Sequence, residues 1–226
     1  MEKYLEHSLR YFYTDSILLI VSFLTTIICI LLRKRFVELS ILPIYPLVCF
    51  LQLLSYSLYY FLSPENQNLV IQYFDYTIFI FLATEFYTLL FVFYKSIFSN
   101  PLRIILKILF VIYTFNLALT LMKNIEPQGT FYLIQAVFVL IPAIIYIINI
   151  FQSDPKENLL NEPQFWITIG VLLYFLSTIP LYLAQKFIFS SDGDVIEPTV
   201  YSINLICYTI FFLFIIRAYL CKQKEI

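Results

Sequence analysis

The stretch TFYLIQAVFVLIPAIIYIINIF, from Thr130 to Phe151, contains 22 residues and no charged side chain. A run of this length and polarity matches the roughly 20 apolar residues that an α-helix needs to cross a bilayer. Six further runs of similar character flank it. The seven runs cover about 11–32, 36–62, 73–98, 102–122, 130–151, 165–188 and 198–220. The sequence therefore predicts seven membrane-spanning helices joined by short connections.

The composition of the whole chain supports this prediction. Of its 226 residues, 61% are hydrophobic and 13% are charged, whereas soluble domains contain about 45–50% apolar and about 25% charged residues. An open sheet cannot satisfy its backbone in hydrocarbon, and the strict alternation of a transmembrane barrel is absent. We therefore predict an all-α, polytopic membrane protein that forms a single transmembrane domain over residues 1–226, surrounded by the lipid bilayer.

Basic residues set the expected orientation. With the N-terminus outside, ten of the 14 lysines and arginines fall in the inner loops and tail, and four fall outside. This asymmetry follows the positive-inside rule and predicts an N-out, C-in topology. The first apolar run is expected to remain as a span, because the residues before it lack the pattern of a cleaved signal peptide.

Prolines are expected to shape several of these helices. Glu-Pro pairs at 126–127, 162–163 and 197–198 are typical of helix starts, because proline suits the first helical turn and a carboxylate complements the helix dipole. Four other prolines lie inside the apolar runs and are expected to kink the helices or interrupt their hydrogen-bond ladders. These are Pro43, Pro46, Pro142 and Pro180.

Glu85 is the main ionisable residue inside the predicted spans. It lies near the middle of the third run, and no Lys or Arg occurs at comparable depth in another run. An ionised side chain at the bilayer centre costs about 2.5–3.5 kcal/mol on insertion scales, so such residues are candidates for function. Without a cationic partner, burial favours the neutral, hydrogen-bonded acid. Glu85 is thus predicted to be a proton switch, a ligand contact, or a protonated residue that ties helices together.

Further polar residues recur at helical spacing in five other runs and mark the faces that point into the bundle. Most of them fall in the outer half of the bilayer under the predicted topology. They are expected to line a ligand-binding cavity open to the outside, and interhelical hydrogen bonding is the alternative explanation. Together with Glu85, the candidate site residues are Gln52, Tyr56, Asn116, Gln135, Tyr174, Ser177, Asn204 and Tyr208.

The residue inventory argues against several kinds of chemistry. The single histidine, His7, cannot supply an imidazole metal centre or the base of an intramembrane Ser-His hydrolase. Three glycines cannot build a glycine-rich phosphate loop, and a net charge of −1 offers no basic surface to nucleic acid. The four cysteines show no C-x-x-C spacing and are expected to be reduced. We predict no enzymatic activity, no cofactor, no metal and no nucleic-acid partner.

Two segments carry a resemblance to known proteins. The stretches YTIFIFLATEFYTLLFVFYKSIF (Tyr76–Phe98) and EPQFWITIGVLLYFLSTIPLY (Glu162–Tyr182) resemble a group of small seven-helix membrane proteins of Bacteroidota-type bacteria. The resemblance implies sensing, because such proteins are often encoded near sensor histidine kinases. We therefore expect a receptor-like sensor of the bacterial inner membrane. It would bind a small or lipophilic ligand and signal through a separate protein, such as a histidine kinase, at the cytoplasmic face.

Two other functions stay open at this point. One is a small proton-coupled or ion-coupled transporter or channel that uses Glu85, and the other is a structural subunit of a membrane complex. For the sensor, the expected docking surface is the inner loop Gln152–Pro163, together with the turn Arg33–Arg35 and the tail Lys222–Glu225. The mixed charges of the loop suit a polar, reversible interface.

Overall fold

The computed structural model describes the backbone of residues 2–62, 67–97, 99–122, 129–152, 159–188 and 193–221. Over these ranges the chain is helical and contains no strand. The elements in order are α1 (Glu2–Leu32), the 3-10 turns η1 (Arg33–Arg35) and η2 (Val37–Leu39), α2 (Ile44–Leu62), α3 (Gln67–Ser96), α4 (Asn100–Met122), α5 (Gly129–Gln152), the 3-10 turn η3 (Leu159–Asn161), α6 (Pro163–Ile188) and α7 (Gly193–Tyr219). The all-α prediction is confirmed.

Six stretches are long and apolar enough to cross a bilayer. They are Val37–Ser55, Thr77–Ser96, Asn100–Met122, Phe131–Gln152, Pro163–Leu181 and Ser202–Tyr219. The apolar segment described in α1 is shorter, Ser16–Leu32. Length and polarity therefore agree with a multi-pass membrane protein, as predicted.

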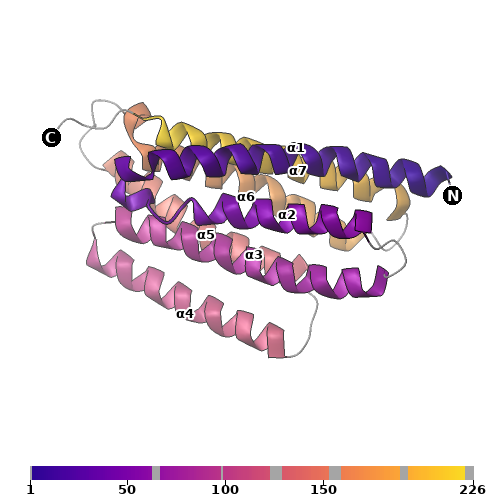
Figure 1. Cartoon of the computed structure of the whole chain (residues 1–226). Helices are drawn as coiled ribbons and strands as arrows, with labels where there is room; N and C mark the ends of the chain where they lie inside the picture. The colour runs from indigo at the N-terminus through magenta and orange to yellow at the C-terminus, as the bar shows by residue number, and fades with distance from the viewer. Residues whose placement is uncertain are drawn as a thin grey trace.

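The seven α-helices run back and forth along a common direction, so that α1 begins at one end of the bundle and α7 finishes at the other (Figure 1). We call the end at which α1, α3, α5 and α7 finish the C-terminal end. Helix α7 packs against α1 and α6, and α3 packs against α2 and α5. Helix α4 is the outermost, because only 17% of its apolar stretch is buried, against 50% for α3.

The second span is not a single helix. The sequence predicts a helix over 36–62, but α2 begins only at Ile44, so the prediction is wrong over 36–43. Pro43 supplies the physical reason, because proline has no N–H and disfavours helical backbone in the residue before it. Pro43 lies just before the first residue of α2, and Pro46 lies in its first turn.

The backbone of this broken segment is satisfied by short-range hydrogen bonds. The N–H of Ser40 donates to the carbonyl of Val37 at 3.2 Å. Tyr219 of α7 donates its hydroxyl to the carbonyl of Leu39 at 2.5 Å, although 180 residues separate the two. Non-helical backbone at membrane depth is tolerated only with such partners. The Tyr219 hydroxyl thus connects the segment before α2 to α7 by a hydrogen bond.

Other boundaries also differ from the sequence prediction. Helices α1, α3 and α7 begin nine, six and five residues earlier than the apolar runs, because hydropathy gives no signal for the polar residues that begin these helices. The Glu-Pro pair at 162–163 starts α6 as predicted, whereas the pair at 197–198 lies inside α7, and the pair at 126–127 lies outside the described residues. Helices α5 and α6 continue through Pro142 and Pro180.

Helices α6 and α7 approach each other closely at Gly170. A Cβ atom placed there would lie 2.8 Å from Cδ2 of Phe211 and 2.9 Å from Cβ of Phe214. Small residues allow such close approach between membrane helices. We expect Gly170→Val to lower the unfolding free energy by about 1–3 kcal/mol, because the added methyl groups overpack the contact.

Thermal unfolding of the purified protein in detergent measures this effect. The matched control is Ser177→Val, two turns further along α6, because Ser177 is exposed. Equal melting temperatures for the two variants would show that the close contact at Gly170 does not exist.

Candidate functional site

Glu85 is 2% exposed near the middle of the α3 span, and its carboxyl group receives three hydrogen bonds. The Tyr45 hydroxyl of α2 donates to Oε1 at 2.6 Å, and the Tyr208 hydroxyl of α7 donates to the same oxygen at 3.4 Å. Nε2 of Gln135, on α5, donates to Oε2 at 2.6 Å. The Tyr45 and Tyr208 hydroxyls also hydrogen-bond to each other. Because each tyrosine has a single O–H donor, one of the two hydroxyl hydrogens is shared between Glu85 and the other tyrosine. One carboxyl group therefore joins four helices.

Two further helices reach this cluster. Tyr113 of α4 donates to Oε1 of Gln135 at 2.9 Å. Tyr174 of α6 packs edge-on against the Tyr208 ring, with 4.8 Å between the ring centroids. Every helix from α2 to α7 thus contributes a side chain at this depth. We call the hydrogen-bonded set Tyr45, Glu85, Tyr113, Gln135 and Tyr208 the Glu85 network.

The break in the second span positions Tyr45. Because α2 begins at Ile44, its first turn lies inside the membrane-spanning stretch Val37–Ser55, and Tyr45 belongs to that turn. The hydroxyl that donates to Glu85 is therefore carried by the first turn of α2.

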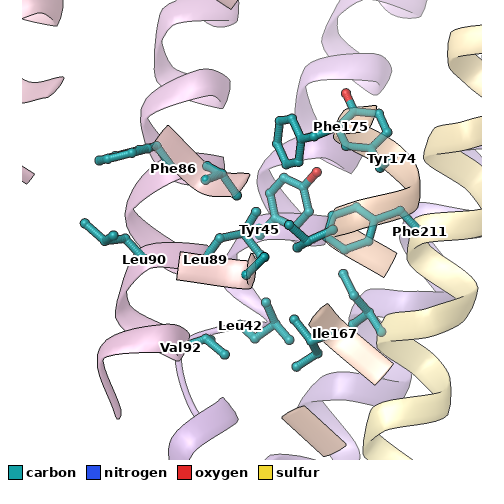
Figure 2. Packing of buried hydrophobic residues seen from close by; sticks show 14 of the residues in the cluster. Leu42, Tyr45, Phe86, Leu89, Leu90, Val92, Ile167, Tyr174, Phe175 and Phe211 are labelled. Atoms are coloured by element: carbon teal, nitrogen blue, oxygen red, sulfur yellow. The ribbon is translucent and has the colours of Figure 1, made fainter. Parts of the chain in front are cut away.

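Aromatic packing encloses the network. Figure 2 shows Tyr45 among Tyr174, Phe175 and Phe211, with Leu89 on its other side. The centroids of the Tyr45 and Phe211 rings are 5.9 Å apart. On the α4 side, the ring of Tyr113 stacks on Phe86 at 3.7 Å. Hydrogen bonds in such surroundings are electrostatically stronger than in water, and unpaired polar groups are costly.

The network offers partners to either protonation state of Glu85. Among the described residues, the titratable groups that interact with Glu85 are Tyr45, Cys49, Tyr113 and Tyr208, and no Lys or Arg is among them. The three donors match an ionised carboxylate, which only accepts hydrogen bonds. A protonated carboxyl must donate one, and a half-turn of the Gln135 amide would present its oxygen as the acceptor. The two states therefore need different hydrogen-bond partners.

The structure brings only part of the predicted site together. Gln135 and Tyr208 bind Glu85, and Tyr174 packs on Tyr208. Asn204 lies one turn before Tyr208 on α7, and within the described part of the chain its buried Oδ1 has no hydrogen-bond partner.

In the part of the chain that the structure describes, none of the remaining predicted residues forms a hydrogen bond with Glu85. Gln52 is half-buried two turns beyond Tyr45, and Asn116 is half-buried on the peripheral α4. Ser177 is exposed on α6, and the side chain of Tyr56 lies outside the described residues. The cavity open to the outside stays a prediction.

Sequence reasoning missed Tyr45 and Tyr113 as site residues. Tyr113 belongs to the polar face that continues to Asn116, so its inward position was available from the spacing. Tyr45 lies four residues before Cys49 and seven before Gln52, and so extends the polar face of the second run to the depth of Glu85. Tyr45 in the second run and Glu85 in the third run lie at similar depth in their spans. This similarity was the signal that could have paired them.

A second cluster lies at the C-terminal end of the bundle, around the single tryptophan. The Trp166 Nε1 donates to the carbonyl of Leu160 at 2.8 Å. The Arg217 guanidinium of α7 lies 5.0 Å from the Trp166 ring centroid, and Phe214 stacks on the ring at 5.9 Å. These contacts join η3, α6 and α7, two of which also reach the Glu85 network.

Comparisons with protein-family models, with curated proteins and with solved structures return no match for this chain. The function is therefore argued from the geometry of the Glu85 network and of the two ends of the bundle.

Proposed function

We propose that this protein is a membrane sensor in which the Glu85 network acts as the switch. The observation that carries the proposal is a single buried carboxyl group that accepts hydrogen bonds from α2, α5 and α7. A change in its protonation alters which side chains donate and which accept at a point where these helices meet. Packed cores respond to such local changes by moving between discrete arrangements.

The proposed output lies at the C-terminal end, around Trp166. Helix α7 carries both Tyr208 and Arg217, and α6 carries both Tyr174 and Trp166. A shift of either helix at the network is therefore transmitted to the tryptophan cluster. As the resemblance implies, a separate protein such as a histidine kinase would read the change. The turn η1 is part of the proposed docking surface, whereas residues 153–158 and 222–226 lie outside the described residues.

We propose seven spans with the N-terminus outside the cytoplasm and the C-terminus inside. The basic residues favour this orientation, and α1 begins and α7 finishes at opposite ends of the bundle (Figure 1). A reporter fused after Ile226 is expected to be cytoplasmic and one fused before Met1 external. Accessibility assays on intact cells measure both. Labelling of the two ends from the same side would contradict an odd number of spans.

Fluorescence of Trp166, the only tryptophan, tests the sensor. In liposomes, we expect its emission maximum to shift when pH is varied, because protonation of Glu85 rearranges α6 and α7. The shift should be lost in Glu85→Gln, which cannot ionise. Glu38→Gln is the matched control, since Glu38 is exposed outside the network, and it should retain the shift. A shift that survives in Glu85→Gln would contradict the proposal.

Proton-coupled transport is the second candidate, and a specific observation favours it. Within the described residues, three buried side-chain atoms have no hydrogen-bond partner: Oδ1 of the half-buried Asn204, and both amide atoms of the buried Gln164. Gln164 lies ten residues before Tyr174 on α6, about 15 Å along the helix. Unpaired amide atoms of this kind can hold water molecules by hydrogen bonds, and a chain of such waters would carry a proton to and from Glu85.

Proton flux separates transport from sensing. Liposomes loaded with a pH-sensitive dye should show no protein-dependent flux if the protein is a sensor. Flux that disappears in Glu85→Gln would replace the sensor with a transporter. A structural subunit, the third candidate, would co-purify with a stable membrane complex and show neither response.

A further inference from the structure

A groove of about 440 Å³ lies between α3 and the outermost helix α4. Its apolar lining comes from Ile41, Leu90, Phe91, Leu106, Phe110 and Val111. The groove does not contain any residue of the Glu85 network. Phe110 and Val111 are exposed on the bundle surface, so the groove opens towards the surrounding hydrocarbon.

The groove has a defined length. Towards the N-terminal end, the Tyr87 hydroxyl and the Thr114 Oγ1 form a hydrogen bond of 2.9 Å that joins α3 to α4. Towards the C-terminal end, the groove reaches Tyr94, two helical turns after Tyr87, and Lys107. Seven residues of α-helix span about 10 Å. The groove therefore extends for about two helical turns along α3, which suits part of an acyl chain.

Basic side chains gather at the C-terminal end of this groove. Lys107 lines it, and Arg103 precedes Lys107 by one turn on the same face of α4. The Arg103 guanidinium lies 5.5 Å from the ring of Tyr94, and the Lys95 Nζ lies 5.4 Å from the ring of Phe91. Both rings line the groove.

Acidic residues do not balance these cations on α3 and α4. Helix α4 contains no Asp or Glu, and α3 contains none after Glu85. The exposed Glu38 of η2 is the closest carboxylate in sequence to Ile41 of the lining. The bond from Arg103 Nε to the Ile97 carbonyl, 2.8 Å, uses one of the five N–H donors of the guanidinium. The groove thus combines an apolar floor with an electropositive end.

We propose that the groove between α3 and α4 binds an anionic phospholipid, with an acyl chain along its apolar lining and the phosphate beside Lys107 and Arg103. Basic pockets between membrane helices recognise anionic headgroups in this way. Zwitterionic lipid offers the same acyl chain but no net charge for the cations. The inference rests on the groove and its charges alone, and it is independent of the sensor.

Quenching of an engineered tryptophan by brominated lipid tests the proposal on the full chain. The reporter is Phe110→Trp in a Trp166→Phe background, which leaves one tryptophan in the groove. The reference reporter is Ile112→Trp in the same background, because Ile112 is exposed on the lipid-facing side of α4. Each is placed in phosphatidylcholine vesicles that contain a minor fraction of brominated phosphatidylglycerol or of brominated phosphatidylcholine.

We expect brominated phosphatidylglycerol to quench Phe110→Trp more strongly than brominated phosphatidylcholine does, and both lipids to quench Ile112→Trp equally. Lys107→Gln should weaken the preference for phosphatidylglycerol about fivefold, as loss of one basic residue near the surface predicts. Lys34→Gln, an exposed lysine of η1 at the same end, should leave it unchanged.

Native mass spectrometry of the unmodified chain gives a second readout. The protein released from nanodiscs of mixed lipid should retain phosphatidylglycerol in preference to phosphatidylcholine. Equal quenching of Phe110→Trp by both lipids would overturn the proposal, as would a preference that Lys107→Gln leaves intact. A dimer without retained lipid would show that a second copy of the chain covers the groove.

Discussion

Glu85→Lys is expected to abolish the accumulation of folded protein, whereas Glu85→Gln should accumulate nearly as the wild type does. The lysine ammonium would lie where Tyr45, Tyr208 and Gln135 all direct donors, in a buried position without an anionic partner. An uncompensated buried charge costs about 3–5 kcal/mol. Glutamine keeps an acceptor oxygen for the two tyrosines, and rotation of the Gln135 amide supplies an acceptor for the new NH₂ group.

Membrane yield, size-exclusion behaviour and thermal unfolding measure this pair of substitutions. Glu38→Lys is the control for the charge reversal, because Glu38 is exposed, and it should fold normally. A folded, monodisperse Glu85→Lys protein beside an unfolded Glu85→Gln protein would show that the carboxyl group does not sit among three donors.

Tyr45→Ala is expected to cost about 3–5 kcal/mol of unfolding free energy, the range for deletion of a buried aromatic side chain. The Tyr45 ring is fully buried and lies 5.9 Å from Phe81 and 5.7 Å from Phe212 between ring centroids. Tyr45→Phe keeps the ring and removes only the hydroxyl. It should cost about 0.5–3 kcal/mol, the range that covers a hydrogen bond to a neutral or to an ionised carboxyl group.

Chemical or thermal unfolding of the two variants separates packing from hydrogen bonding. Phe115→Ala is the matched aromatic deletion, because Phe115 is 64% exposed on α4, and it should change stability by no more than about 0.5 kcal/mol. Equal stability of Tyr45→Ala and Phe115→Ala would contradict the burial of Tyr45 at the start of α2.

The sequence predicted the membrane class, and most helix ends, because apolar runs of about 20 residues have few alternatives in lipid. It did not predict that α2 would begin at Ile44. The apolar run 36–62 shows no clear boundary at Pro43. Its hydropathy therefore does not show whether Pro43 bends the helix or delays its start. The break is stabilised by short-range backbone hydrogen bonds and also by contacts far along the chain, such as that of Tyr219 with Leu39, which hydropathy does not reveal.

The site was predictable to a similar extent. Depth and the cost of a buried charge identified Glu85, and helical spacing placed Gln135 and Tyr208 on inward faces. Spacing within one helix does not show which faces of different helices meet. Ser177 and Asn116 were therefore grouped with the residues around Glu85, although neither forms a hydrogen bond with it among the described residues. Tyr45 was missed because its position depends on the broken span.

Infrared difference spectroscopy across pH tests most directly whether Glu85 is a protonation switch. The wild type in liposomes should show the C=O stretching band of a buried protonated carboxyl group that grows as pH falls. The band should be absent in Glu85→Gln and retained in Glu38→Gln. Its midpoint should coincide with that of the Trp166 emission shift. A band that survives in Glu85→Gln, or an emission shift with a different midpoint, would contradict the account.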